Sequence, residues 1–197
     1  RLEPEGPKAG DTKVNAKDGQ KYAWIPPGRF TMGCSPGDSE CYSDEKPSHP
    51  VTISRGYWLG QTPVTVGAWK RYRAASGAAA LQAKDNEGRK LNEAGGNDSL
   101  PAVAMTHEEA GSFCAWVGGR LPTEGEWEYA ARAGTAGARY GDLDAVAWYG
   151  DNSGRTRIDS AEIRKSDPRN YQQRLFENGN GPKAVGLKRK NDWNLYD

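Results

Sequence analysis

The 197-residue sequence has few of the residues that most often carry metal or redox chemistry: two histidines, three cysteines and two methionines. Metal sites built on two cysteines usually recruit further Cys or His nearby. His49 is the nearest candidate to Cys34 and Cys41 and stands alone, so a metal site at these cysteines is not favoured. No apolar run approaches the roughly 20 residues that a membrane-spanning helix needs, so no transmembrane segment is predicted. The net charge is only +1, which gives no broad electrostatic case for a nucleic-acid partner or an anionic membrane.

The composition is instead rich in large aromatic residues and in turn formers. Seven Trp and nine Tyr compensate for a hydrophobic content of only 36%, because each aromatic side chain buries a large area. The 25 Gly and 12 Pro favour many loops and little regular secondary structure. We therefore expect one domain with an aromatic core.

Cys34 and Cys41 flank the turn-rich loop Ser35–Glu40. A chain that turns at Pro36-Gly37 can bring their Cα atoms within the roughly 4.4–6.8 Å that a disulfide needs. A disulfide there predicts an oxidising compartment, so that the protein would be secreted or periplasmic. The alternative is a pair of ordinary thiols in a cytosolic loop.

Local patterns predict several short strands and three helices. Residues 1–20 are polar and are predicted to form an extended N-terminal tail; residues 155–182 are predicted to be an irregular surface insertion. Strand-like runs occupy residues 21–25, 29–32, 51–53 and 57–59. The helices are predicted from three caps: Thr65 with a stop at Gly77, Thr106 with Glu109 and a stop at Gly118-Gly119, and Thr123 with Glu126, ending near Ala133.

The helical spacing also predicts which faces are buried. Ala110, Phe113, Cys114 and Val117 follow the spacing of one apolar stripe. In the third helix Trp127 shares a face with Ala130 and Ala131, and this face is predicted to be buried.

The segment 118–132, which reads GGRLPTEGEWEYAAR, closely resembles the core signature of the formylglycine-generating enzyme (sulfatase-modifying factor) family. Five further segments occur in the family's order: 24–33, 45–51, 63–65, 100–103 and 193–197, the last with Asn194 in place of the usual glycine. The resemblance covers residues 21–197. It implies an α+β, C-type-lectin-like fold with low regular secondary structure.

The same resemblance implies a function. The founding activity of the family oxidises a sulfatase cysteine to formylglycine, with O2 and copper held by a pair of cysteines. That pair belongs to a C-terminal portion beyond Asp197, so no catalytic residue is assigned and copper is expected only if the pair exists there. A sulfatase-like protein or peptide would be the partner. The alternative is a non-catalytic, secreted binding or assembly module on the same scaffold.

The family also implies structural calcium, and Asn152 falls about where a calcium ligand is expected. Asp151 and Ser153 could add oxygen ligands, although the same residues also suit a simple Asx turn. Cys114 matches a position that is a half-cystine in some members, and it is otherwise a buried free thiol.

The remaining polar candidates are interpreted structurally. His49 lies in a family loop, and His107 lies in a helical first turn where exposure is expected. Neither is predicted to be catalytic. Glu124, Glu126 and Glu128 are interpreted as favourable charges at a helix start rather than as paired catalytic carboxylates.

Overall fold

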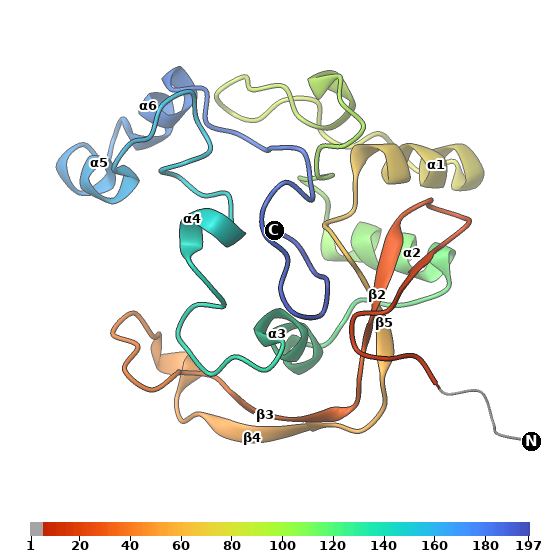
Figure 1. Ribbon diagram of the computed structural model, residues 1–197. Helices are drawn as coiled ribbons and strands as arrows, with labels where there is room; N and C mark the ends of the chain where they lie inside the picture. The colour runs from red at the N-terminus through yellow and green to blue at the C-terminus, as the bar shows by residue number, and fades with distance from the viewer. Residues whose placement is uncertain (1–5) are drawn as a thin grey trace, which may run out of the picture.

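The computed structural model describes residues 6–197 and shows a mixed α/β fold with short strands (Figure 1). β1 (Thr12–Val14), β2 (Lys21–Ile25) and β5 (Tyr57–Gly60) form an antiparallel sheet in the order β1-β2-β5. β3 (Gly28–Met32) and β4 (His49–Ile53) form a separate two-stranded ribbon. The four predicted strand runs correspond to β2, β3, β4 and β5.

The N-terminal segment differs from the predicted tail. Residues 1–5 lie outside the described residues, but β1 pairs with β2 in the register Lys13↔Tyr22. The Asn15 side chain donates to the Val117 carbonyl, 3.0 Å away, and Asp18 is fully buried. The polar sequence forms an exposed edge strand and a hydrogen-bonded turn, because polar side chains are well tolerated at a sheet edge.

The three predicted helices are present with the predicted caps. α1 (Val66–Ser76), α2 (His107–Val117) and α3 (Glu124–Arg132) each begin after a threonine whose hydroxyl accepts a first-turn amide. The capping boxes predicted for α2 and α3 are both formed. α1 and α2 end at Gly77 and Gly118, which have the left-handed conformation that glycine adopts without strain.

The segment 155–182 is more regular than predicted. It contains α5 (Ser160–Ser166) and α6 (Tyr171–Glu177), which follow the short α4 (Leu143–Val146). Two 3-10 turns, Ser43–Glu45 and Asn92–Gly95, complete the described elements. α5 has no buried residue and α6 has only Leu175, so neither helix carries the apolar stripe from which a helix is recognised. In residues 6–197 no helix has the length and apolarity to cross a bilayer.

In the part of the chain that the structure describes, two clusters of buried side chains form the core. One lies between α1 and α2 and contains Trp69, Tyr72 and Phe113. The other joins α3 to the strands around Ile25, Ile53, Tyr129 and Ala130.

The prediction that Trp127 is buried is wrong, since this residue is 57% exposed. Tyr129 takes the inward position of α3, with ring centroids 5.3 Å from Phe30 and 4.8 Å from Trp193. Ala130, which directly follows Tyr129, is fully buried.

Candidate functional site

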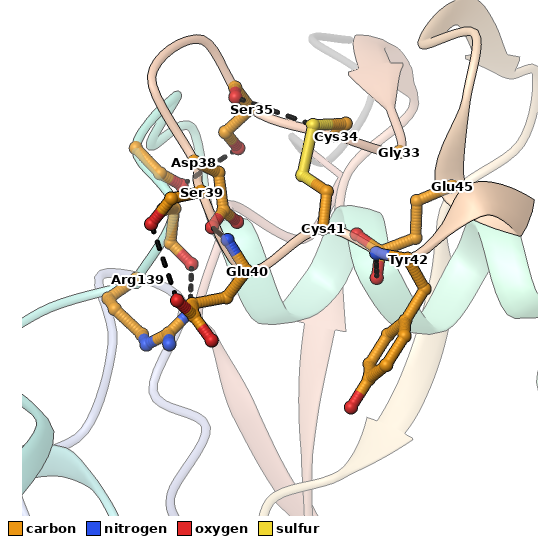
Figure 2. The surroundings of a disulfide bond; sticks show 12 residues. Gly33, Cys34, Ser35, Asp38, Ser39, Glu40, Cys41, Tyr42, Glu45 and Arg139 are labelled. Atoms are coloured by element: carbon orange, nitrogen blue, oxygen red, sulfur yellow. Dashed lines mark hydrogen bonds between the residues drawn. A yellow bond between two sulfur atoms is a disulfide. The ribbon is translucent and has the colours of Figure 1, made fainter.

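The Cys34–Cys41 disulfide closes a surface loop between β3 and β4 (Figure 2). The Cα atoms of the two cysteines lie 5.7 Å apart, within the range anticipated from the sequence. Inside the loop, the Asp38 amide donates to the Ser35 carbonyl and the Glu40 amide donates to the Asp38 carboxylate. The middle of the loop is thus held by short-range hydrogen bonds, whereas the Ser35 hydroxyl also donates to the Gly137 carbonyl, 3.1 Å away.

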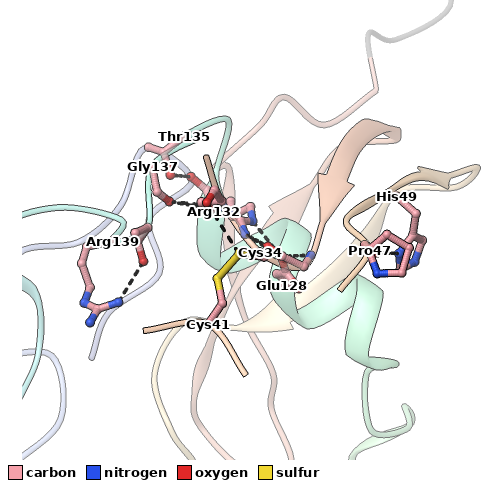
Figure 3. A network of polar contacts seen from close by, with 12 residues as sticks. Cys34, Cys41, Pro47, His49, Glu128, Arg132, Thr135, Gly137 and Arg139 are labelled. Carbon is pink, nitrogen blue, oxygen red and sulfur yellow. Dashed lines mark hydrogen bonds and ion pairs between the residues drawn. A yellow bond between two sulfur atoms is a disulfide. The ribbon is translucent and has the colours of Figure 1, made fainter. Parts of the chain in front are cut away.

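A buried arginine holds the Cys34 side of this loop against α3 (Figure 3). The Arg132 side chain is only 9% exposed and forms an ion pair with Glu128, with Nη2 2.7 Å from Oε1. Its guanidinium also donates to the Gly33 carbonyl at 2.9 Å and to the Ser35 hydroxyl at 3.1 Å. A further bond reaches the Gly137 carbonyl at 3.3 Å. All five donors of the guanidinium are thus engaged, as a buried arginine requires.

Glu128 binds the same part of the backbone as Arg132. Its Oε1 accepts from the Gly33 amide at 3.1 Å and from Arg132 Nε at 2.8 Å. Glu128 and Arg132, one turn apart on α3, therefore bind both the amide and the carbonyl of Gly33. This arrangement fixes the backbone next to Cys34.

Of the other two acidic residues of α3, Glu126 caps the helix N-terminus and Glu124 faces solvent. Glu126 accepts from the Thr123 amide at 2.8 Å and receives two bonds from Arg120, each 2.7 Å long. The Arg120 side chain, followed by the Thr123 backbone bond, lowers the pKa of Glu126 to about 2, against the opposing effect of burial. Glu124 is exposed. The three carboxylates are therefore accounted for by capping and ion pairing.

Asn152 lies in a polar cluster next to α4. Its side-chain oxygen accepts from the Tyr149 amide at 2.9 Å, and its amide group donates to Asp144 and to the Ala147 carbonyl. Arg157 binds both oxygens of Asp144, at 2.8 and 2.7 Å. A calcium ion at Asn152 would have to compete with these contacts, because the side-chain oxygen that would bind calcium already accepts from the Tyr149 amide. Calcium binding there stays a prediction.

The neighbours of Asn152 are engaged as well. Asp151 accepts from the Ser160 amide at 2.9 Å, and the Ser153 hydroxyl accepts from Asn180 at 2.9 Å. Sequence reasoning missed Asn180, which is 97% buried and also binds the Gly150 carbonyl. Nothing in the local sequence pairs residue 180 with residues 150 and 153.

The remaining cysteine and His107 lie on α2, whereas His49 begins β4 and pairs with Met32, just before Cys34. Cys114 is a half-buried free thiol, and burial raises its pKa. Because the thiolate is the nucleophile and the metal ligand, this shift disfavours both roles. His49 is exposed and its Nδ1 lies 3.2 Å from the Pro47 carbonyl, while His107 is exposed on the first turn of α2.

Comparisons with known proteins agree with the fold and the signature. The sulfatase-modifying factor enzyme 1-like domain family matches residues 8–197, so the chain belongs to this family. PvdO from Pseudomonas aeruginosa has the same fold, with a TM-score of 0.71 over 98% of this chain and 72% of its own, at 24% identity.

Curated relatives match parts of the chain. The formylglycine-generating enzyme of Streptomyces coelicolor is 29% identical over 153 residues, 59% of this chain and 48% of its own. Hercynine oxygenase of Mycobacterium tuberculosis is 30% identical over 125 residues, 51% of this chain and 29% of its own. The inactive C-alpha-formylglycine-generating enzyme 2 of Mus musculus is 56% identical over 41 residues, 21% of this chain and 13% of its own. The chain spans less than half the length of each of these relatives.

Proposed function

We propose that this domain is the scaffold of a formylglycine-generating oxidoreductase that acts on a cysteine in a sulfatase-like protein. The observation that carries the proposal is the family match over residues 8–197. The similarity to the Streptomyces formylglycine-generating enzyme supports the choice of reaction.

The proposed reaction needs copper thiolates that the described residues do not offer. Cys34 and Cys41 are bonded to each other, and Cys114 stands alone with a raised thiol pKa. None of the three fits a pair of copper-binding thiolates. The proposal therefore requires a cysteine pair from chain outside residues 6–197, and no step is assigned to a residue within them.

We further propose a secreted or periplasmic location. The support is the Cys34–Cys41 disulfide, since such bonds persist in oxidising compartments. In that setting the substrate would be an exported polypeptide, presented before or without folding around its target cysteine.

The test is a formylglycine assay on the full-length protein. The protein is loaded with copper and incubated with O2, a thiol reductant and a peptide containing Cys-x-Pro-x-Arg. The expected product carries an aldehyde in place of the CH2–SH group, detected by mass spectrometry and by trapping with a hydrazide probe. The matched control is the same peptide with serine in place of cysteine. Absence of aldehyde from copper-loaded, folded protein would refute the enzymatic proposal.

A second candidate is a non-catalytic binding or assembly module. The similarity to the inactive mouse relative, 56% over 41 residues, favours it. Under this alternative the full-length protein would bind an unfolded exported polypeptide and release it unchanged. Saturable binding of the peptide without aldehyde formation would support the module over the enzyme.

A further inference from the structure

An open hollow of about 520 Å³ borders α1. Its lining includes two neighbouring cations of the helix, Lys70 and Arg71, together with Asp98, Ser99 and Val185. Figure 1 shows α1 well separated from the β3–β4 ribbon that carries the disulfide loop. The hollow is thus distinct from the site described above.

Among residues 6–197, the Arg71 side chain is oriented by a hydrogen bond to the backbone. Its Nη1 donates to the Asp18 carbonyl at 2.6 Å. The guanidinium lies against Gly19, where an added Cβ would come within 2.6 Å of Nη1 and where the backbone has a φ of +71°. Gly19 therefore provides the space that the guanidinium fills, and it suits the left-handed backbone there.

The charge of Arg71 is not neutralised by a neighbouring acid. The Asp18 carboxylate points to the Gln20 amide, 2.9 Å away, and to the Tyr22 hydroxyl, 2.6 Å away. Within residues 6–197, Arg71 forms no ion pair with any carboxylate. An oriented arginine with free donors presents the planar fork that matches a carboxylate.

The surroundings define the charge and polarity of a ligand. Lys70 pairs with Asp98 at 2.5 Å, so the two cations and one acid of the hollow leave a net charge of +1. The Ser99 hydroxyl has no hydrogen-bond partner in the described part of the chain. The side chains of Ala74 and Val185 supply an apolar wall.

The first-turn amides of α1 are already hydrogen-bonded within the protein and are not free to bind an anion. The amides of Val66 and Gly67 donate to the carbonyls of Leu100 and Asp98, and the Ala68 amide donates to the Thr65 hydroxyl. Recognition of an anion in the hollow would therefore depend on side chains rather than on the helix terminus.

We propose that this hollow binds a small organic monocarboxylate. The carboxylate lies against the guanidinium of Arg71 and near the hydroxyl of Ser99, and the apolar body of the ligand packs on Ala74 and Val185. A single negative charge balances the net charge of the lining, and the volume falls within the roughly 300–1,000 Å³ of small-molecule sites.

Calorimetric titration of the full-length protein with benzoate tests the proposal. Benzamide, a neutral molecule of the same shape, and inorganic phosphate serve as comparison ligands. We expect saturable binding of benzoate and at least tenfold weaker binding of benzamide. Arg71→Gln should weaken benzoate binding by about tenfold or more, and Arg71→Lys by less, since the charge is kept and the fork is lost.

Arg55→Gln is the matched control, because it removes one exposed positive charge elsewhere and should leave benzoate affinity unchanged. Unchanged far-UV circular dichroism verifies that each variant is folded, and Ser99→Ala provides a second variant with a milder expected loss. Equal affinity of wild type and folded Arg71→Gln would overturn the proposal. Benzamide binding as tightly as benzoate, or phosphate binding more tightly, would overturn the assignment to a carboxylate.

Discussion

Replacing Arg132 by methionine should destabilise the protein more than any surface charge substitution. The change removes the five contacts of the guanidinium: two to Glu128 and one each to Gly33, Ser35 and Gly137. It also leaves the Glu128 carboxylate, 15% exposed, without its cation. Breaking one partner of a buried ion pair costs about 3–5 kcal/mol, so we expect a loss of that size in the free energy of unfolding.

Urea unfolding at pH 7, followed by tryptophan fluorescence, measures this loss. In a separate thermal unfolding experiment, the Tm should fall by about 6–20 °C, at roughly 2–4 °C per kcal/mol for a chain of this size. Arg139→Met is the matched control, because Arg139 is exposed and, within residues 6–197, its side chain bonds only to the carbonyl of Ala138. We expect the control to change the free energy by less than about 0.5 kcal/mol.

A double variant separates two causes of the lost stability: the loss of the ion pair itself and the burial of a Glu128 carboxylate without its cation. Arg132→Met with Glu128→Leu removes both charges, and buried pairs replaced by apolar residues often lose little stability. The double variant should therefore be more stable than Arg132→Met alone. If Arg132→Met lies within about 0.5 kcal/mol of wild type, or if the double variant is no better than the single one, the anchoring role is refuted.

Three further predictions rest on the described contacts, and a fourth, on calcium, rests on the family resemblance. Mass spectrometry without reductant should find Cys34 and Cys41 linked, and Cys34→Ser with Cys41→Ser should cost about 2.5 kcal/mol for a separation of seven residues, measured by urea unfolding. The pKa of Glu126 is lowered from 4.5 to about 2, so the stability it adds should be full above pH 4.5 and be lost as the pH falls towards 2. Acid unfolding of Glu126→Gln should lack that component. Calcium should raise the Tm in a saturable way that Asn152→Ala abolishes; an unchanged wild-type Tm contradicts the calcium prediction. Native Cys114 should react slowly with iodoacetamide at pH 7, since burial raises the thiol pKa, and urea should restore a normal rate.

The features that the sequence predicts correctly are those determined within a few residues. Thr106 and Thr123 each exchange bonds with a glutamate three positions later, so the whole motif is visible in the chain. The disulfide is predictable for a similar reason, because its two cysteines are seven residues apart and flank a turn. Capping and short loop closure depend on local geometry.

The features that the sequence does not predict depend on distant partners. Arg132 contacts Gly33 and Ser35 across 99 and 97 positions, and no periodicity in either segment shows this pairing. In α3, Trp127 and Tyr129 are both aromatic, and helical spacing alone favours Trp127 with Ala130. The packing of Tyr129 on Trp193 and Phe30 selects the inward face, and those partners come from opposite ends of the chain.

The signature of residues 118–132 can therefore be explained by anchoring rather than by catalysis. Arg120 and Glu126 fasten the start of α3, while Glu128 and Arg132, one turn further, bind the backbone beside Cys34. The disulfide restrains the loop at Cys41, and Arg132 restrains it at Gly33 and Ser35. Reduction of the disulfide would thus release the loop from one side only, because the arginine contacts do not involve sulfur. The oxidised loop should consequently be rigid relative to α3, and its position should depend on Arg132 even when the disulfide is intact.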